Sequence, residues 1–165
     1  MTRPFRLAAL ALASALVLAA CGSSGSSGTS TSSAPAATSA TGSARPASLV
    51  ATRTSSLGTF LVDAKGRALY LWDADHGSMS TCSGACAQAW PPLTTAGTPK
   101  AGGKVKASLL GTTTRSNGSR EVTYAGHPLY YYAGDSAVGQ TSGQGSDSFG
   151  SPWWVVSPAG MAIQN

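Results

Sequence analysis

The chain has 165 residues, of which 10% are charged, and its 11 basic against 6 acidic residues give a formal net charge of +5. Arg3 and Arg6 belong to an N-terminal segment that we expect to be removed, which leaves 9 basic against 6 acidic residues, or +3. This weak basic balance lacks the concentrated basic stripe of a nucleic-acid-binding protein, so nucleic acid is excluded from the expected partners.

The first 20 residues have the pattern of a signal peptide. The two arginines precede an apolar run from Leu7 to Ala20 that only Ser14 interrupts. A transmembrane helix needs about 20 apolar residues, whereas a run of about 10–14 is typical of a signal-peptide core.

The run ends in Leu-Ala-Ala-Cys, which resembles the lipobox of bacterial lipoproteins. The resemblance implies that Cys21 is acylated and holds the protein on the extracytoplasmic face of the cell membrane. Cleavage of an ordinary secretory signal near Ala20 is the alternative.

The segment after the cysteine is expected to be a disordered tether. Residues 22–48 contain only Ser, Ala, Gly, Thr, Pro and one Arg, with no aromatic or large aliphatic side chain to bury. A segment of this composition cannot form a core. As a flexible coil, its 27 residues would span an r.m.s. distance of about 30 Å. Residues 21–48 would therefore link the membrane to a folded part, residues 49–165, which is long enough for one domain.

Two cysteines remain in the folded part. In an exported chain, an even number of cysteines left after lipidation of Cys21 predicts a disulfide, here between Cys82 and Cys86. Residues four apart on a helical turn lie about 6 Å apart at Cα, within the disulfide range. Residues 85–90 could form one or two such turns before Pro91 ends them.

The remaining elements are predicted strands. Three strand pairs are expected, each around a turn: 60–62 with 68–72 around Asp63–Gly66, 112–114 with 121–124 around Asn117–Gly118, and 153–156 with 161–163 around 157–160. Asn-Gly is the strongest short hairpin signal, and Asp and Gly at the first and fourth positions suit a type I turn. No segment beyond the signal peptide has a sustained helical period, so the expected class is all-β.

Two stretches of the folded part match at a constant offset of 60. Residues 66–75 and 126–135 share Gly, Leu, Tyr, a second aromatic residue and Asp in register. With average residue usage, a chance match to Tyr-x-aromatic-x-x-Asp occurs roughly once in ten thousand positions. The match therefore indicates a duplicated unit, with repeat 1 at about 55–93 and repeat 2 at about 115–163.

The repeated stretch resembles a known family. The sequences Tyr70-Leu71-Trp72-Asp73-Ala74-Asp75 and Tyr130-Tyr131-Tyr132-Ala133-Gly134-Asp135 are similar to the Tyr-x-(Phe/Trp/Tyr)-x-x-Asp motif of bacterial lipoproteins and secreted repeats, and the similarity extends to 82–93 and 153–160. The resemblance implies export, lipidation and two antiparallel β units in one compact domain, with a short helical turn near the cysteines. It implies no reaction. Phe149-Gly150-Ser151-Pro152 stands where the first copy has its cysteines and Trp-Pro-Pro, so the disulfide would belong to repeat 1 alone.

The aromatic residues of the motif have two open interpretations. Alternate residues of a strand share a face, so the two aromatic side chains of each motif point the same way. They could pack the two repeats together, with the aspartates closing the turns that follow. They could instead form an exposed platform for a sugar, a peptidoglycan fragment or a flat cofactor. The candidate binding residues are then Tyr70, Trp72, Asp75, Trp90, Tyr130, Tyr132 and Asp135.

The folded part contains several residues of the types that bind metal ions. Possible soft ligands are His76, Met79 and the two cysteines, which lie within eleven residues, and His127 and Met161 elsewhere. Such residues could hold copper, but the cysteines are expected to be oxidised and zinc sites space their cysteines more closely. We therefore expect no metal or other cofactor, with copper or non-covalently bound haem as the alternatives.

The sequence predicts a binding protein and no enzyme. It has two histidines and one glutamate, and neither a G-x-S-x-G nor a His-Glu-x-x-His motif. We expect a membrane-anchored extracytoplasmic lipoprotein that acts as a cell-surface binding or interaction module, with a cell-wall glycan or another envelope protein as its partner. The alternative is an extracytoplasmic redox, metal or cofactor-handling lipoprotein.

Overall fold

The computed structural model describes residues 47–164. The predicted signal peptide, the lipidation site Cys21 and nearly all of the tether lie outside the described residues. Within the described range, no helix has the length and apolar character that crossing a membrane requires.

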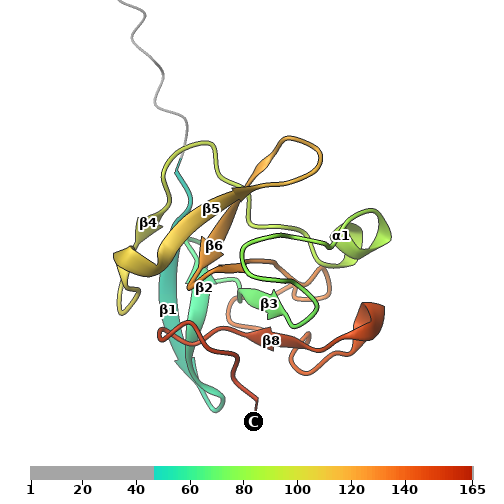
Figure 1. Ribbon diagram of the computed structural model, residues 1–165. Helices are drawn as coiled ribbons and strands as arrows, with labels where there is room; N and C mark the ends of the chain where they lie inside the picture. Colours follow the sequence, from blue (N-terminus) through green and yellow to red (C-terminus); the bar gives the residue numbers. More distant parts are fainter. Residues whose placement is uncertain (1–46, 165) are drawn as a thin grey trace, which may run out of the picture. The chain divides into compact units, whose positions relative to one another are not determined.

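Strands dominate the described part of the chain (Figure 1). In chain order the elements are β1 (Leu49–Ser55), β2 (Gly58–Asp63), β3 (Tyr70–Trp72), α1 (Ala85–Ala89), β4 (Lys100–Ala101), the 3-10 turn η1 (Ala107–Leu109), β5 (Leu110–Thr114), β6 (Arg120–Tyr124), β7 (His127–Pro128), the 3-10 turn η2 (Ser148–Gly150) and β8 (Trp153–Val155). Their sheets have the strand orders β2-β1-β4, β3-β8 and β5-β6-β7. The all-β class is confirmed, and the short helix lies at the cysteine pair and ends before Pro91, as expected.

The hairpin predicted around Asn117–Gly118 is β5–β6, in which Thr114 lies opposite Arg120. Gly118 has a φ of 80°, a conformation that glycine adopts without steric cost.

The sequence did not predict β1, which pairs with β2 along its whole length after Leu49. Its last four residues, Thr-Arg-Thr-Ser, are polar like the preceding segment, and they form a strand by pairing with β2.

The two halves of the fold, residues 49–94 and 110–157, exchange their closing segments. Leu93, at the end of the first half, accepts a backbone hydrogen bond from Val122 of the second half at 2.8 Å. Val156, at the end of the second half, accepts one from Leu61 of the first half, also at 2.8 Å. Each half therefore supplies a strand that completes the other.

Tyr70 and Tyr130 lie where the two halves meet. The backbone N–H of Tyr70 donates to the carbonyl of Tyr130 at 2.8 Å, and the N–H of Tyr130 donates to the carbonyl of Tyr70 at 2.9 Å. Reciprocal contacts between equivalent residues are what a two-fold axis produces. The duplicated halves are thus related by a local pseudo-two-fold axis that passes between the two tyrosines.

The alternation of side chains along the strands divides the core into two clusters. The aromatic cluster contains Phe60, Val62, Ala68, Tyr70, Trp72, Cys82, Cys86, Trp90, Tyr130, Trp153 and Val155. The aliphatic cluster contains Val50, Leu61, Leu69, Leu71, Leu93, Val105, Val122, Tyr124, Leu129 and Val156. Tyr70 and Trp72 lie in the first cluster, and Leu69 and Leu71 in the second, as the two-residue period of a strand requires.

A stack of four aromatic rings runs through the aromatic cluster. Trp90 and Trp153 are nearly parallel, with ring centroids 4.0 Å apart and an interplanar angle of 2°. Trp72 stacks on the outer face of Trp153 at 5.0 Å, and Tyr132 lies against Trp90 at 4.5 Å. Each aromatic pair contributes about 0.5–1.5 kcal/mol beyond the burial of its surface. The stack therefore joins side chains from both halves into one rigid unit.

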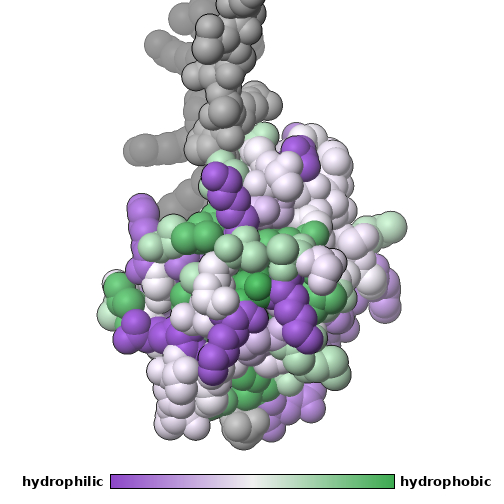
Figure 2. All heavy atoms as spheres, turned by 90° about the vertical axis from the view of Figure 1, so that its left-hand side faces the viewer, coloured by the Kyte–Doolittle hydropathy of each residue, from purple (hydrophilic) through white to green (hydrophobic). Residues whose placement is uncertain are grey.

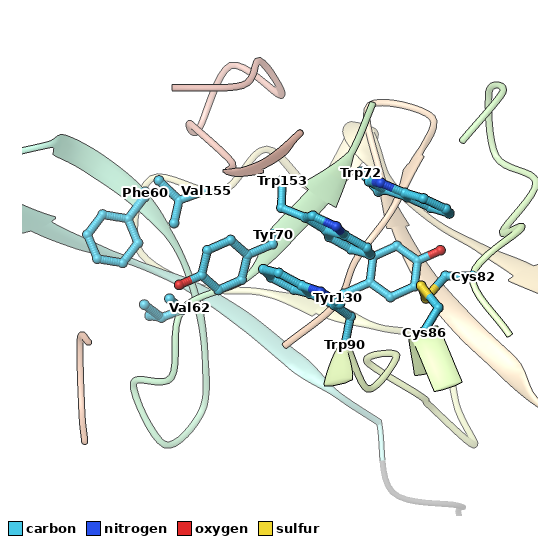
Figure 3. Packing of buried hydrophobic residues seen from close by; sticks show 11 residues of the cluster. Phe60, Val62, Tyr70, Trp72, Cys82, Cys86, Trp90, Tyr130, Trp153 and Val155 are labelled. Atoms are coloured by element: carbon cyan, nitrogen blue, oxygen red, sulfur yellow. A yellow bond between two sulfur atoms is a disulfide. The ribbon is translucent and has the colours of Figure 1, made fainter. Parts of the chain in front are cut away.

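The motif tyrosines close this stack at its edges. Tyr70 meets Trp90 edge-on at 5.3 Å, and Tyr130 meets Trp153 edge-on at 5.2 Å. Figure 3 shows the two parallel tryptophans flanked by one tyrosine on each side. The two pairs are equivalent in the two halves, so the pseudo-two-fold axis also passes between the tryptophans.

Gly143 tests how tightly the stack is packed. A Cβ there would lie 2.6 Å from Trp90 Cη2 and 3.0 Å from Tyr132 Cβ. We expect Gly143→Ala to lower the free energy of unfolding by about 1–3 kcal/mol, because both rings are held by their neighbours. The matched control is Gly102→Ala, whose Cβ would meet its nearest atom at 3.4 Å. Equal denaturant midpoints for the two variants would contradict this account.

Candidate functional site

The aspartates of the repeated motif each hold the tyrosine of the other half. Tyr70 donates its hydroxyl to Asp135 Oδ2 at 2.6 Å, and Tyr130 donates to Asp75 Oδ2 at 2.6 Å. We call these two hydrogen bonds the clasps. Because donor and acceptor come from different halves, the motif is completed only when the halves pack together.

Each aspartate also closes the loop that follows its own strand. Asp75 Oδ1 accepts hydrogen bonds from the backbone N–H of Thr81 at 2.7 Å and from its hydroxyl at 2.8 Å. Asp135 Oδ1 accepts one from the N–H of Ser142 at 2.8 Å. A single carboxylate therefore fixes both a loop and the tyrosine across the pseudo-two-fold axis.

The structure places most of the expected binding residues in the core. Tyr70, Trp90 and Tyr130 have no exposed surface, and Trp72 is 8% exposed. Asp75 is buried as well, whereas Tyr132 and Asp135 are half-buried. The motif aromatics are thus packed between the halves, which is the first of the two arrangements considered above.

Burial and nearby carboxylates keep both clasp tyrosines protonated. Burial, followed by the hydrogen bond to Asp135, raises the pKa of Tyr70 far above its usual range. Burial, followed by the charge of Glu121, does the same to the pKa of Tyr130. Both hydroxyls therefore remain hydrogen-bond donors at any physiological pH.

A buried ion pair lies beside the second clasp. Arg115 donates to Glu121 Oε2 at 2.6 Å, and the two side chains are 7% and 0% exposed. Arg115 also donates to Ser80 Oγ at 2.6 Å and to the backbone carbonyl of Cys82. Ser80 in turn lies 2.6 Å from the hydroxyl of Tyr130. These contacts join the ion pair to the clasp in one polar network, which sequence reasoning missed because Ser80 and Cys82 are far from Arg115 in the chain.

The polar network makes the two halves unequal. Glu121 precedes Val122 as Phe60 precedes Leu61, so the second half has a carboxylate where the first has a buried phenyl ring. Among residues 47–164, the buried side-chain polar atoms without a hydrogen-bond partner are Glu121 Oε1 and Trp90 Nε1. Burial raises the pKa of Glu121 to about 7, and the hydrogen bond and charge of Arg115 only partly oppose this effect.

The predicted disulfide is confirmed. Cys82 and Cys86 are bonded, with their Cα atoms 5.3 Å apart. Both are buried in the aromatic cluster, and Cys82 provides the carbonyl that Arg115 binds. The disulfide thus anchors the loop that contributes to the polar network.

The candidate metal ligands are spread over different environments. His76 is exposed, Met79 is 67% exposed in the same turn, and His127 is half-buried in β7. Met161, also 67% exposed, lies near the C-terminal end. In the part of the chain that the structure describes, no three His, Cys, Asp or Glu side chains lie close enough to hold a metal ion together.

A second polar group, which joins buried Asp63 to the exposed Arg67, was also not predicted. The guanidinium of Arg67 lies 3.7 Å from the ring centre of Tyr131, and Asp63 accepts hydrogen bonds from Arg67 Nε and the Tyr131 hydroxyl, each at 3.1 Å. Burial acts to raise the pKa of Asp63, but hydrogen bonds from Arg67, Lys65 and Tyr131 lower it below its ordinary value. The group borders a shallow hollow of about 280 Å³.

The larger surface hollow has small, mostly polar walls. It measures about 610 Å³ and is lined by Ala47, Ser48, Thr94, Thr95, Ala96, Gly118, Ser119 and Arg120. Pockets for small molecules are usually lined by aromatic and large apolar side chains. This lining has neither, so the hollow does not have the character of a small-molecule pocket.

Comparison with known families gives one match. The model of a family described as a secreted repeat of unknown function matches residues 51–94 and 111–157, more than half of the chain. The two matches coincide with the two structural halves, and each contains one copy of the tyrosine-aspartate motif. The family expected from the sequence is therefore confirmed. Comparisons with curated proteins and with solved structures gave no match.

The two clasps offer a matched pair of substitutions. Tyr130→Phe leaves Asp75 and Ser80 without their shared partner in a buried site, so we expect a loss of about 2–3 kcal/mol in the free energy of unfolding. Tyr70→Phe should cost about 1 kcal/mol, because water can reach the half-buried Asp135. Urea unfolding measures both. A larger loss for Tyr70→Phe would show that the clasps are not distinguished by burial.

The ion pair should give stability an unusual pH dependence. With its pKa raised from 4.5 to about 7, Glu121 binds its proton more tightly in the folded than in the unfolded state. Its contribution to stability is then fully present below pH 4.5 and lost as the pH rises through 7. The unfolding free energy of the wild type minus that of Glu121→Gln should fall by on the order of 3 kcal/mol over this range.

The control for this measurement is Asp147→Asn, which removes an exposed carboxylate and should give a nearly constant difference. If the difference in unfolding free energy between the wild type and Glu121→Gln rises with pH, pairing with Arg115 affects the pKa of Glu121 more than burial does.

Proposed function

The chain belongs to a family of secreted repeats of unknown function, and from this premise we propose that it is a lipid-anchored extracytoplasmic module that binds another component of the cell envelope. The anchor is Cys21, which follows Leu18-Ala19-Ala20 at the point where the signal-peptide pattern ends. Two or three acyl chains on one cysteine make a lasting membrane anchor, since a single chain binds only marginally. The proposal is a binding role and includes no catalytic step or cofactor.

The observation that supports surface binding is the filled interior. The largest fully buried side chains are Trp90, Trp153, Tyr70, Tyr124 and Tyr130. The buried motif aromatics Tyr70, Trp72 and Tyr130 are therefore core residues and are not available as a platform. Recognition then falls to the outer surface, where the two hollows described above are shallow.

The character of that surface favours a macromolecular partner. Figure 2 shows the side on which β1 and β4 lie in Figure 1, where hydrophobic areas are interrupted by hydrophilic ones. Interfaces that form reversibly are about as apolar as the rest of a protein surface, so a mixed surface of this kind suits a partner that associates and dissociates.

Cys21→Ser tests the proposal in two steps. We expect the variant to move from the membrane fraction to the medium, because it lacks the acylated side chain. A Ser33→Ala variant, altered within the same Ser-rich segment, should stay in the membrane fraction. Membrane retention of Cys21→Ser in cell fractionation would contradict lipid anchoring.

The released Cys21→Ser protein then measures the interaction role. Added to envelopes isolated from cells that lack the chain, it should bind saturably, with the unlabelled protein competing against a labelled sample. Binding that never saturates would contradict a specific partner in the envelope.

A further inference from the structure

Strand β5 forms one edge of the β5-β6-β7 sheet, and its register shows which backbone groups face outward. At the two ends of the β5–β6 pair, Arg115 N donates to the Ser119 carbonyl and Ala125 N to the Leu109 carbonyl, both towards the partner strand. In an antiparallel pair such positions alternate with positions that point away. The N–H and C=O groups of Thr112 and Thr114 therefore point away from β6.

The opposite strand confirms this alternation. Val122, which lies opposite Thr112, forms its backbone hydrogen bonds with Leu93 and Leu129 on the far side of β6. Within residues 47–164, no hydrogen bond reaches the backbone N–H or C=O of Thr112 or Thr114. The outer edge of β5 is an unpaired row of donors and acceptors.

The equivalent edge in the first half is covered at its start, beside Leu49 and Val50. Thr52 of β1 lies opposite Leu61 as Thr112 lies opposite Val122, so β1 and β5 occupy matching positions. The extended segment β4 runs parallel beside the start of β1, and beyond it Gly102 N donates to the Val50 carbonyl at 2.8 Å. The fold itself therefore shows what this edge geometry accepts, which is an extended polypeptide.

Strand β5 also lacks the features that protect sheet edges. Natural edge strands are often protected by proline, by charged side chains or by a bulge. The sequence of β5 is Leu-Gly-Thr-Thr-Thr, with neither proline nor charge. The turn η1 that precedes it satisfies only the N–H of Leu110, which donates to the carbonyl of Ala107.

A cation lies beside the open edge. Arg120 of β6 lies opposite Thr114, and its guanidinium donates to Thr112 Oγ1 at 2.9 Å. In the described part of the chain, the ion pairs are those of Arg67 and Arg115, so Arg120 has no carboxylate partner there. An acidic side chain on an added strand would complement it.

We propose that the outer edge of β5 takes up an extended, acidic segment of another envelope polypeptide as an added strand. Thr112 and Thr114 would supply the main-chain hydrogen bonds, as sheet edges do when they bind peptides, and Arg120 would select for a carboxylate. This inference rests on the proposed interaction role and names the surface and the class of partner.

Thr112→Pro in the Cys21→Ser background tests the edge. Because the Thr112 N–H points outward, proline removes no hydrogen bond to β6 and is tolerated on an edge strand. We expect saturable binding to isolated envelopes to weaken about tenfold or more. Thr114→Pro is the second variant, and circular dichroism shows which variants are folded. The matched control is Thr54→Pro at the corresponding place on β1, which should bind as the parent does.

The nature of the partner is tested on the same envelopes. Protease treatment should abolish binding, whereas digestion of the cell-wall glycan with muramidase should not. Arg120→Gln, which leaves the backbone unchanged, should weaken binding several-fold and reduce its sensitivity to salt.

Three results would overturn the inference while leaving the interaction role in place. They are undiminished binding by the folded proline variants, binding that survives protease, and a parent protein that sediments as a dimer and becomes a monomer on Thr112→Pro. The last result would identify a second copy as the occupant. Absence of saturable binding by the parent itself would overturn both the role and the edge.

Discussion

The fold depends on the contact between Tyr70 and Tyr130 across the pseudo-two-fold axis. Their backbones hydrogen-bond to each other, their rings close the tryptophan stack, and their hydroxyls donate to an aspartate of the opposite half. Each tyrosine thus contributes backbone hydrogen bonds, apolar ring packing and a side-chain hydrogen bond. Since the backbone and hydroxyl contacts cross between the halves, the motif serves to join two repeats and is not a property of one repeat alone.

The symmetry of this contact is broken on one side only. The first half surrounds its tyrosine with Phe60 and aliphatic side chains, whereas the second has the ion pair of Arg115 and Glu121. A buried ion pair is costly unless other hydrogen bonds satisfy its members, and the loop that the disulfide anchors supplies two of them to the arginine. The disulfide and the ion pair therefore lie on the same side of the fold, where the two halves differ.

Local signals in the sequence were sufficient for much of the fold. The hairpin at Asn117–Gly118, the disulfide and the alternation that separates Tyr70 from Leu71 each depend on neighbouring residues, and each was predicted. The exchange of closing strands was not, because backbone pairing between distant segments leaves no trace in composition or period. The same holds for Ser80 and Cys82, which tertiary packing alone brings to Arg115.

The exchange of closing strands makes the smallest complete folding unit two repeats long. A chain with a single repeat would have an aspartate without a tyrosine to hold, a tryptophan without its stacking partner and a sheet without its last strand. It could satisfy all three only by associating with a second copy of itself. The present chain is in this sense a homodimer whose two subunits have been joined end to end, and the connection between them, residues 95–109, includes the β4 segment that pairs with the start of one sheet edge.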